Sequence, residues 1–185
     1  MIDEIKVHTA ERMEKALTSL KNEFGRVRTG RASTGILDHV MVDYYGTPTR
    51  LNQLATLSVP ESRMITIQPW DVSSLKTIEK AILTSDLGLT PSNDGKLIRI
   101  SIPELTEERR REIVKIIKQM TEDCRVAVRL ARKEGNDHLK KAEKAKEITE
   151  DELHKAMDEI QKMTDEHIQE ADKILNKKEE DVMEV

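Results

Sequence analysis

The chain has 185 residues, of which 36% are charged and 37% hydrophobic but only 2% aromatic. A core with so few aromatic rings must use aliphatic side chains and methionine, which suits helices packed along narrow seams better than a broad β-sandwich. The single cysteine excludes an intrachain disulfide, and no apolar stretch reaches the roughly 18 residues of a membrane span. The first residues, which include Asp3 and Glu4, show no secretory signal, so we expect a cytoplasmic protein that contacts no membrane.

The net charge of −4 hides two segments with opposite charge. Residues 109–133 contain nine Lys or Arg against three Asp or Glu, whereas residues 143–185 contain seven against fifteen. A basic helix and an acidic helix are therefore expected in one chain.

The first 28 residues have the periodicity of a helix. Apolar residues recur at steps of four and three, the spacing of a helix seam: Met13, Leu17, Leu20, Phe24 and Val27. A helix over residues 2–28 is predicted, ended by Gly30, and Gly25 is expected to soften its last turn because glycine disfavours the helix by about 1 kcal/mol.

The period then becomes that of strands. Alternating apolar residues predict strands at residues 40–44, 57–59, 64–68 and 98–102, with a turn at 46–48 and a loop at 91–95. A short helix is expected after Ser73 or Ser74 as the N-cap. Its expected buried residues are Leu75, Ile78, Ala81 and Ile82.

A second long helix is predicted from residue 106 to about 145, with Thr106 as the N-cap. Its seam is expected at Ile113, Ile117, Met120, Cys124, Ala127 and Ala131. Residues 135–137, Gly-Asn-Asp, are its expected weak point.

The start of a third helix has a nearly complete signature. Thr149 and Glu152 have the spacing of a capping box, and Ile148 and Leu153 that of a hydrophobic staple. The helix is expected to continue to about residue 180, with polar Thr164 in its seam. The apolar seam is predicted at Leu153, Met157, Ile160, His167, Ala171 and Ile174.

These elements predict an α+β fold with two domains. Residues 1–30 and 105–185 would form a three-helix bundle, because each helix has an apolar stripe too long to leave exposed. Residues 31–104 would form a small inserted β/α/β domain, joined to the bundle by two strands of chain that act as a hinge. The hinge is assigned to Gly30, Arg31, Pro103, Glu104 and Leu105.

The strongest candidate site is a basic face of the second helix. Arg125, Arg129 and Arg132 are spaced i, i+4 and i+7 and so share one side. Guanidinium groups bind phosphate well, and without interleaved aromatic residues we expect contact with the backbone of folded RNA. The alternative is a solvated face balanced by the acidic third helix.

Three arginines, Arg26, Arg28 and Arg31, gather where the first helix ends. They could hold phosphate, or could simply stabilise a helix C-terminus. The histidines and Cys124 lack metal-ligand spacing, and Cys124 has the spacing of a buried seam residue. No catalytic constellation, cofactor motif or metal site is present in the pattern, so we expect a protein that is not an enzyme.

Several strings in order along the whole chain resemble the ribosome recycling factor family. They are residues 27–33 (VRTGRAS), 44–48 (YYGTP), 81–89 (AILTSDLGL), 105–110 (LTEERR) and 125–129 (RVAVR) followed by Arg132. The resemblance implies a monomeric, non-enzymatic, elongated L-shaped protein with tRNA-like dimensions. Such factors bind the post-termination 70S ribosome, with the bundle on large-subunit rRNA, and act with elongation factor G and GTP. The subunits separate, and mRNA and tRNA are released.

The resemblance also assigns rRNA-binding residues. Arg132 matches the family's main rRNA-contacting arginine, with Arg129 beside it, and Arg28 and Arg31 match the motif near the hinge. Lys133 is included although the string 133–135, Lys-Glu-Gly, departs from the family pattern. Two alternatives stay open: a generic RNA- or ribosome-associated binding module without splitting activity, and a helical chaperone or adaptor for proteins.

Overall fold

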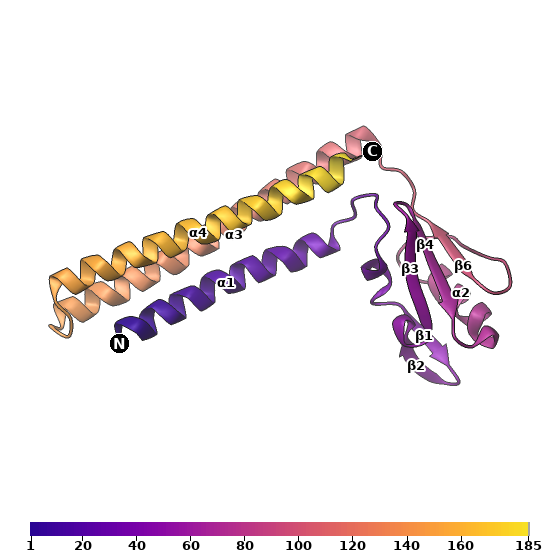
Figure 1. Cartoon of the computed structure of the whole chain (residues 1–185), viewed down its shortest axis with the longest axis horizontal. Coiled ribbons are helices and arrows are strands. Elements are labelled where there is room, and N and C mark those ends of the chain that lie inside the picture. Colours follow the sequence, from indigo (N-terminus) through magenta and orange to yellow (C-terminus); the bar gives the residue numbers. More distant parts are fainter. Residues whose placement is uncertain (185) are drawn as a thin grey trace. The chain divides into compact units, whose positions relative to one another are not determined.

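The computed structural model describes residues 1–184, which fall into two compact units (Figure 1). Unit 1 combines Met1–Val27 with the described chain from Glu108 onward, and unit 2 is the intervening segment Arg28–Glu107. The boundaries expected from the sequence, after residue 30 and before residue 105, lie slightly inside unit 2.

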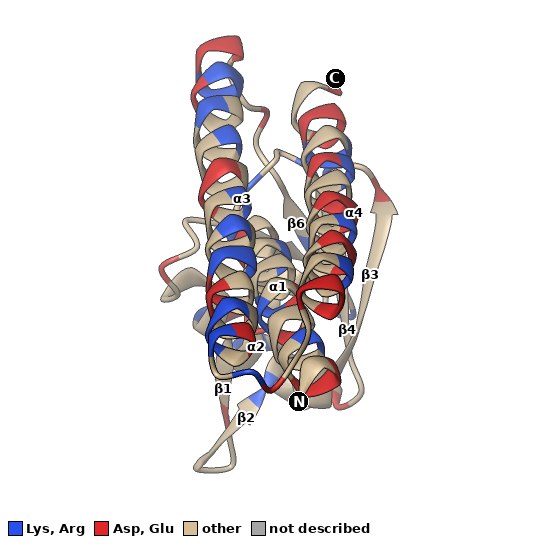
Figure 2. Cartoon of the chain, turned by 90° about the vertical axis from the view of Figure 1, so that its left-hand side faces the viewer, with Lys and Arg blue, Asp and Glu red and all other residues tan. Residues whose placement is uncertain are grey.

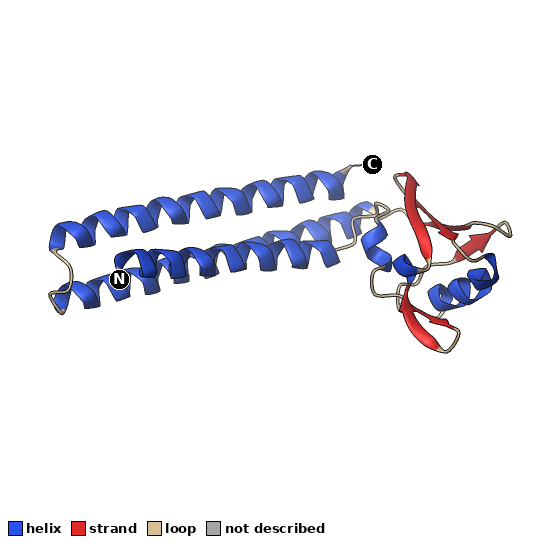
Figure 3. Ribbon diagram, turned by 60° about the horizontal axis from the view of Figure 1, so that its bottom comes forward, coloured by secondary structure: helices blue, strands red, loops and turns tan. Residues whose placement is uncertain are grey.

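Unit 1 contains three long helices among its described residues: α1 (Ile2–Arg26), α3 (Glu107–Lys144) and α4 (Glu150–Met183). α1 and α4 run in the same direction and α3 runs in the opposite one (Figures 1 and 3). With 38 residues, α3 is about 57 Å long. The prediction of three long helices in this order is confirmed. Within residues 1–184, no helix combines the length and the apolar character needed to cross a membrane.

The buried seam of α3 differs from the predicted one by a small rotation. Thr121 and Val128 are fully buried, whereas Met120 is half-buried and Ala127 is exposed, so the prediction was wrong at Met120 and Ala127. Polar Thr121 can occupy the seam because its hydroxyl donates to the carbonyl of Ile117, at 2.8 Å. The buried residues of α3 are Ile113, Ile117, Thr121, Cys124, Val128, Ala131, Gly135, Leu139 and Ala142.

The seam of α4 is rotated in a similar way. Met157, His167 and Ile174 were predicted to be central but are only half-buried, at the edges of the seam. Smaller residues at the centre allow the helices to approach closely. The buried residues of α4 are Leu153, Ala156, Ile160, Thr164, Ala171, Leu175 and Val182.

Gly135 is a point of close helix packing. α3 continues through it without a break, so the predicted weak point was wrong. A Cβ atom at residue 135 would lie 2.5 Å from Thr9 Oγ1 of α1 and 3.2 Å from Ile160 Cδ1 of α4. The Thr9 hydroxyl is fixed there because it donates to the carbonyl of Ile5, at 2.7 Å. Absence of a side chain at residue 135 therefore lets the three helices meet.

The predicted capping box at the start of α4 is confirmed. The Glu152 backbone N–H donates to Thr149 Oγ1 at 3.2 Å, and the Thr149 N–H donates to Glu152 Oε2 at 2.8 Å. Ile148 and Leu153 are both buried, as the predicted staple requires. Local sequence alone thus specifies where α4 begins.

We expect this cap to make stability depend on pH. The hydrogen bonds from Thr149 lower the pKa of Glu152 below its ordinary value of 4.5. A carboxyl group with a lowered pKa in the folded state stabilises that state above its ordinary pKa, and the contribution is lost as the pH falls through the lowered pKa. Urea unfolding of the wild type and Glu152→Gln should differ at about pH 6 and converge toward about pH 3. A stability difference that is the same at both pH values would contradict this role.

Unit 2 contains two antiparallel sheets and a short helix (Figure 3). The first sheet is the hairpin of β1 (Met41–Tyr44) and β2 (Thr47–Arg50). The second has the strand order β3-β4-β6-β5. Its strands are β3 (Ala55–Glu61), β4 (Met64–Pro69), β5 (Pro91–Asn93) and β6 (Ile98–Ser101), and the helix is α2 (Leu75–Leu83).

Two short strands of unit 2 were missed by the sequence analysis. Residues 91–93, expected to be a loop, form the edge strand β5, where proline at the first position is tolerated because it lacks only one ladder donor. Residues 47 and 48, expected in a turn, begin β2, and the turn is made by Tyr45 and Gly46. Ser74 is the N-cap residue of α2, as predicted, but its side chain makes no capping hydrogen bond to that helix. The turn before it, Val72–Ser74, is capped by Asp71, whose side chain accepts from the Ser73 N–H.

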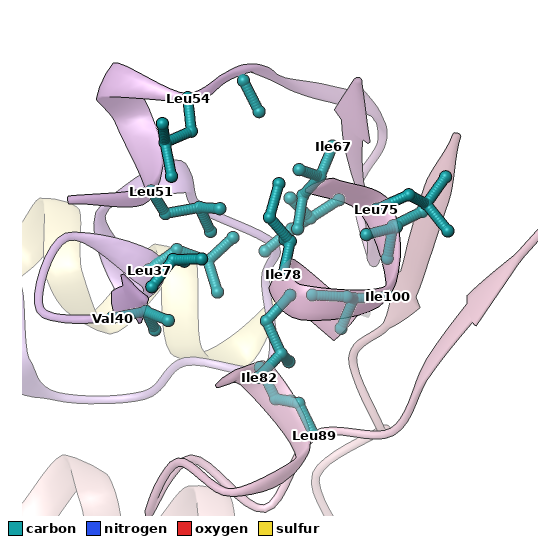
Figure 4. Packing of buried hydrophobic residues seen from close by; sticks show 14 residues of the cluster. Leu37, Val40, Leu51, Leu54, Ile67, Leu75, Ile78, Ile82, Leu89 and Ile100 are labelled. Atoms are coloured by element: carbon teal, nitrogen blue, oxygen red, sulfur yellow. The ribbon is translucent and has the colours of Figure 1, made fainter. Parts of the chain in front are cut away.

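The core of unit 2 is built from aliphatic side chains (Figure 4). Ile78 and Ile82 of α2 and Ile67 and Ile100 of the larger sheet are completely buried. Ala81, predicted to be buried, is only partly so and packs at the edge of this cluster. Further members are Leu37, Val40, Val42, Leu51, Leu54, Ala55, Ile65, Leu75, Leu89 and Ile98.

Candidate nucleic-acid interface

Exposed cations follow one side of α3 along most of its length. They recur at steps of three and four residues, or at sums of these steps (seven and eleven), which keeps them on one side of a helix. Lys and Arg are frequent along α3, and Asp and Glu along α4 (Figure 2). The cationic row consists of Arg111, Lys115, Lys118, Arg129, Lys133, Lys140 and Lys144.

Arg125, predicted to be a phosphate ligand, is half-buried and held by carboxylates of α3 and α4. Its Nε and Nη2 donate to Asp172 Oδ1 of α4 at 3.0 and 2.5 Å, and its Nη1 donates to Glu122 Oε2 at 3.0 Å. The side chain is only 22% exposed. Both edges of its guanidinium are therefore occupied by carboxylates, and its role in the structure is to link α3 to α4.

Arg129 is exposed and shares a carboxylate with Arg125. Its Nη1 donates to Glu122 Oε1 at 3.2 Å. Hydrogen bonds from the two arginines lower the pKa of Glu122, so this carboxylate stays charged. Asp172 and Glu122 together balance the charges of Arg125 and Arg129. Arg129 nevertheless uses only Nη1 in this contact, and its remaining donors face solvent.

Arg132 and Lys133 carry charge that no carboxylate of the described residues balances. The Nη1 of Arg132 donates to the neutral side-chain oxygen of Gln161 on α4, at 3.0 Å. This bond orients the guanidinium without cancelling its charge. Lys133 is exposed and forms no ion pair within residues 1–184, and the same holds for Lys115 and Lys140. The row thus keeps a net positive charge between its two ends.

Arg28 and Arg31 lie in the first linker, after α1 has ended at Arg26. The Nη1 of Arg28 donates to the backbone carbonyl of Leu87 at 2.9 Å, within unit 2. Farther along the same linker, the Ala32 N–H donates to the carbonyl of Ser62 at 2.7 Å. The first linker is therefore attached to unit 2 on both sides of Arg31.

The second linker is attached to unit 2 as well. The Ile102 N–H donates to the carbonyl of Arg63 at 2.8 Å, and the Arg63 guanidinium pairs with Glu104 at 3.1 Å. A Cβ atom at Gly30, where φ is +76°, would lie 3.1 Å from Leu105 Cγ. The two linkers therefore contact each other through Leu105, and the residues predicted to form the hinge are packed as parts of unit 2.

Cys124 is buried, as its spacing predicted, and does not have the surroundings of a reactive thiol. Its Sγ donates to the carbonyl of Ala16 at 3.5 Å, and burial raises the pKa of the thiol. No group of three or more His, Cys, Asp or Glu side chains among the described residues could hold a metal ion. The cationic row is therefore taken as the candidate surface for a partner.

Comparison with known proteins decides the family. The family model described as "Ribosome recycling factor" matches residues 20–183. The chain belongs to the ribosome recycling factor family. Among the similar ribosome-recycling factors, that of Oleidesulfovibrio alaskensis is 58% identical over 184 residues and covers 100% of both chains. That of Geobacillus kaustophilus is 58% identical over 175 residues and covers 95% of each.

Solved ribosome recycling factors share the fold. A solution structure of the factor superposes with a TM-score of 0.79 at 41% identity, over 100% of this chain and 98% of that one. A second structure, with a TM-score of 0.67 and 45% identity over 99% of each chain, is described as models of the T. thermophilus ribosome recycling factor and E. coli elongation factor G bound to the E. coli post-termination complex. The family resemblance drawn from short sequence strings is confirmed, as is a fold that combines a long helical bundle with a small sheet domain.

Proposed function

We propose that this chain recycles ribosomes after translation termination. It binds the post-termination 70S ribosome and, with elongation factor G and GTP, splits it into subunits and releases mRNA and tRNA. The support is membership of the ribosome recycling factor family over nearly the whole chain and the similar factor described with elongation factor G on a post-termination complex. The chain itself acts as a monomeric binding factor without catalysis, in the bacterial cytoplasm where its partners are.

The bundle supplies the contact with large-subunit rRNA. The observation that carries this assignment is the unneutralised charge at Lys133, midway along the cationic row, and at Arg132, next to it on the same helix. α3 contains no Phe, Trp or Tyr on which a base could stack, so the row is suited to phosphates of folded RNA. Phosphate contacts of this kind weaken steeply as salt rises.

The small domain acts as the movable part. Since both linkers are attached to unit 2, the bending is assigned to the chain on the bundle side of each linker, around Val27–Arg28 and Thr106–Glu107. Gly30, Leu105 and the other linker residues attached to unit 2 then move together with the small domain.

The decisive experiment is ribosome splitting followed by light scattering. Purified post-termination complexes should dissociate rapidly only when this chain, elongation factor G and GTP are all present. Binding to ribosomes without faster splitting would favour a generic ribosome-associated module. Affinity that hardly changes with salt would favour a protein-binding adaptor and would count against rRNA contact.

A further inference from the structure

Cations of α3 and acids of α4 follow each other in matching order along the bundle. Each set has a spacing of seven residues, which keeps its members on one side of a helix. The sets are the cations Lys118, Arg125 and Arg132 and the acids Asp165, Asp172 and Glu179. Because α3 and α4 run in opposite directions (Figure 3), the first cation corresponds to the last acid, and three positions for an ion pair result.

Two of these three positions hold an ion pair between the helices. Lys118 Nζ lies 3.2 Å from Glu179 Oε1. The Arg125 guanidinium donates to Asp172 Oδ1, as described above. In both pairs the acid is the one that the matching order assigns to the cation. The same order assigns Asp165 to the third cation, whose charge a direct ion pair would neutralise.

The third position is built differently, because Gln161 lies between the cation and the acid. Arg132 Nη1 donates to Gln161 Oε1 at 3.0 Å, and Gln161 Nε2 donates to Asp165 Oδ1 at 2.9 Å. Within residues 1–184, Arg132 and Asp165 form no ion pair with each other. A neutral amide thus connects two opposite charges that would otherwise be free to meet.

The amide of Gln161 has only one orientation that satisfies both neighbours. A guanidinium can only donate hydrogen bonds and an ionised carboxylate can only accept them, so Oε1 must face Arg132 and Nε2 must face Asp165. Asp165 follows Gln161 by four residues on α4, the spacing at which side-chain pairs of this kind stabilise a helix. The carboxylate therefore holds the amide, and the amide holds the guanidinium.

We propose that Gln161 is a positioning residue for the contact of Arg132 with rRNA. It keeps the guanidinium apart from Asp165, so that the positive charge stays available to a phosphate, and it holds the group in one orientation before binding. The inference rests on the proposed function and adds a residue of the acidic helix to the rRNA contact. A search for cations alone does not find this residue, because its side chain is neutral.

Removal of the amide should let Arg132 pair directly with Asp165. Gln161→Ala is therefore expected to weaken binding to post-termination ribosomes about threefold, which corresponds to the strength of one exposed ion pair. Stability to urea should change little, because Gln161 is exposed and alanine favours the helix. Fluorescence titration of the full chain with ribosomes, at one fixed salt concentration, measures the affinity.

Asp165→Asn is the second substitution of this experiment. It removes the carboxylate but keeps an oxygen that can accept from Gln161. In the wild-type background it should change the affinity little, whereas added to Gln161→Ala it should restore the affinity to near the wild-type value. A role of Gln161 in helix stability alone predicts no such rescue. Glu166→Gln is the matched control, since it removes a charge from the exposed residue next to Asp165 and should act equally in both backgrounds.

Four results would overturn the inference. They are an unchanged affinity of Gln161→Ala, a decrease that Asp165→Asn does not reverse, an equal reversal by Glu166→Gln, and an equal decrease by Gln161→Ala in an Arg132→Ala background. If the wild type binds and splits post-termination ribosomes, any of these rejects the role of Gln161 alone. A wild type that neither binds nor splits them would reject the proposed function itself.

Discussion

Replacement of Gly135 by alanine is expected to lower the free energy of unfolding of the bundle by up to about 2 kcal/mol. The added Cβ would lie 2.5 Å from Thr9 Oγ1 and 3.2 Å from Ile160 Cδ1, so the Thr9 side chain, which is bonded to its own helix, or the helix itself must shift. Such overpacking costs about 1–3 kcal/mol, and alanine's better helix propensity recovers about 1 kcal/mol. Urea unfolding followed by circular dichroism measures the difference.

Gly25 provides the matched control for this substitution. It also lies in a helix of unit 1, but a Cβ atom there would have nothing within 4 Å. Gly25→Ala should therefore raise stability by up to about 1 kcal/mol, through helix propensity alone. If Gly135→Ala stabilised the protein as much as Gly25→Ala, the packing of α1 against α3 would not be as tight as described.

A double substitution identifies the atoms responsible. Thr9→Ala removes both Oγ1 and Cγ2, the two atoms of Thr9 that approach residue 135. Combined with Gly135→Ala, it should restore much of the stability, so that the two substitutions are coupled by about 1 kcal/mol. Additive effects would place the strain elsewhere, at Ile160.

Arg132→Ala is expected to weaken binding to post-termination ribosomes about tenfold or more. Removing one charge-assisted hydrogen bond costs about 1.5–3 kcal/mol, and the guanidinium has no carboxylate partner in the free protein that would offset this. The dependence of affinity on salt should also become shallower, by a slope of about 0.7–0.9 for each phosphate that is no longer neutralised. Filter binding or fluorescence titration at several salt concentrations measures both.

Two other substitutions give this experiment its specificity. Arg125→Ala should chiefly lower stability to urea, since that guanidinium links α3 to Asp172 of α4, and should weaken ribosome binding less than Arg132→Ala does. Lys162→Ala removes an exposed cation from α4 and should leave affinity unchanged. Equal affinity of the wild type and Arg132→Ala, or equal decreases in all three variants, would rule out a specific role for Arg132.

Features set by local sequence were predictable in this fold, and those set by tertiary packing were not. The capping box needs only Thr149 and Glu152, three residues apart, and it was located correctly. The role of Gly135 depends on Thr9 of another helix, so the sequence showed only a weak helix former. β5 is three residues long and begins with a proline, and its pairing with β6 overrides a local sequence typical of a loop.

The candidate site shows the same division. Helical spacing placed Arg125, Arg129 and Arg132 on one side of α3, but it could not show that Asp172, 47 residues farther along the chain, holds Arg125. Lys140 and others at the ends of the row were missed, although extending the same steps of three and four in both directions would have found them. The missed members at the ends were Arg111, Lys115, Lys118, Lys140 and Lys144.

The attachment of both linkers to unit 2 has a mechanical consequence. The chain passes between the bundle and the small domain at two places, around Val27–Arg28 and Thr106–Glu107, which we call the crossings. A force on the small domain would act on both crossings, and only a few φ and ψ angles at each could change to allow rotation. In the proposed rotation of the small domain, two crossings would restrict twisting more than one would. Gly30 and Leu105 would then contribute less as flexible residues than as the contact through which the two linkers move together.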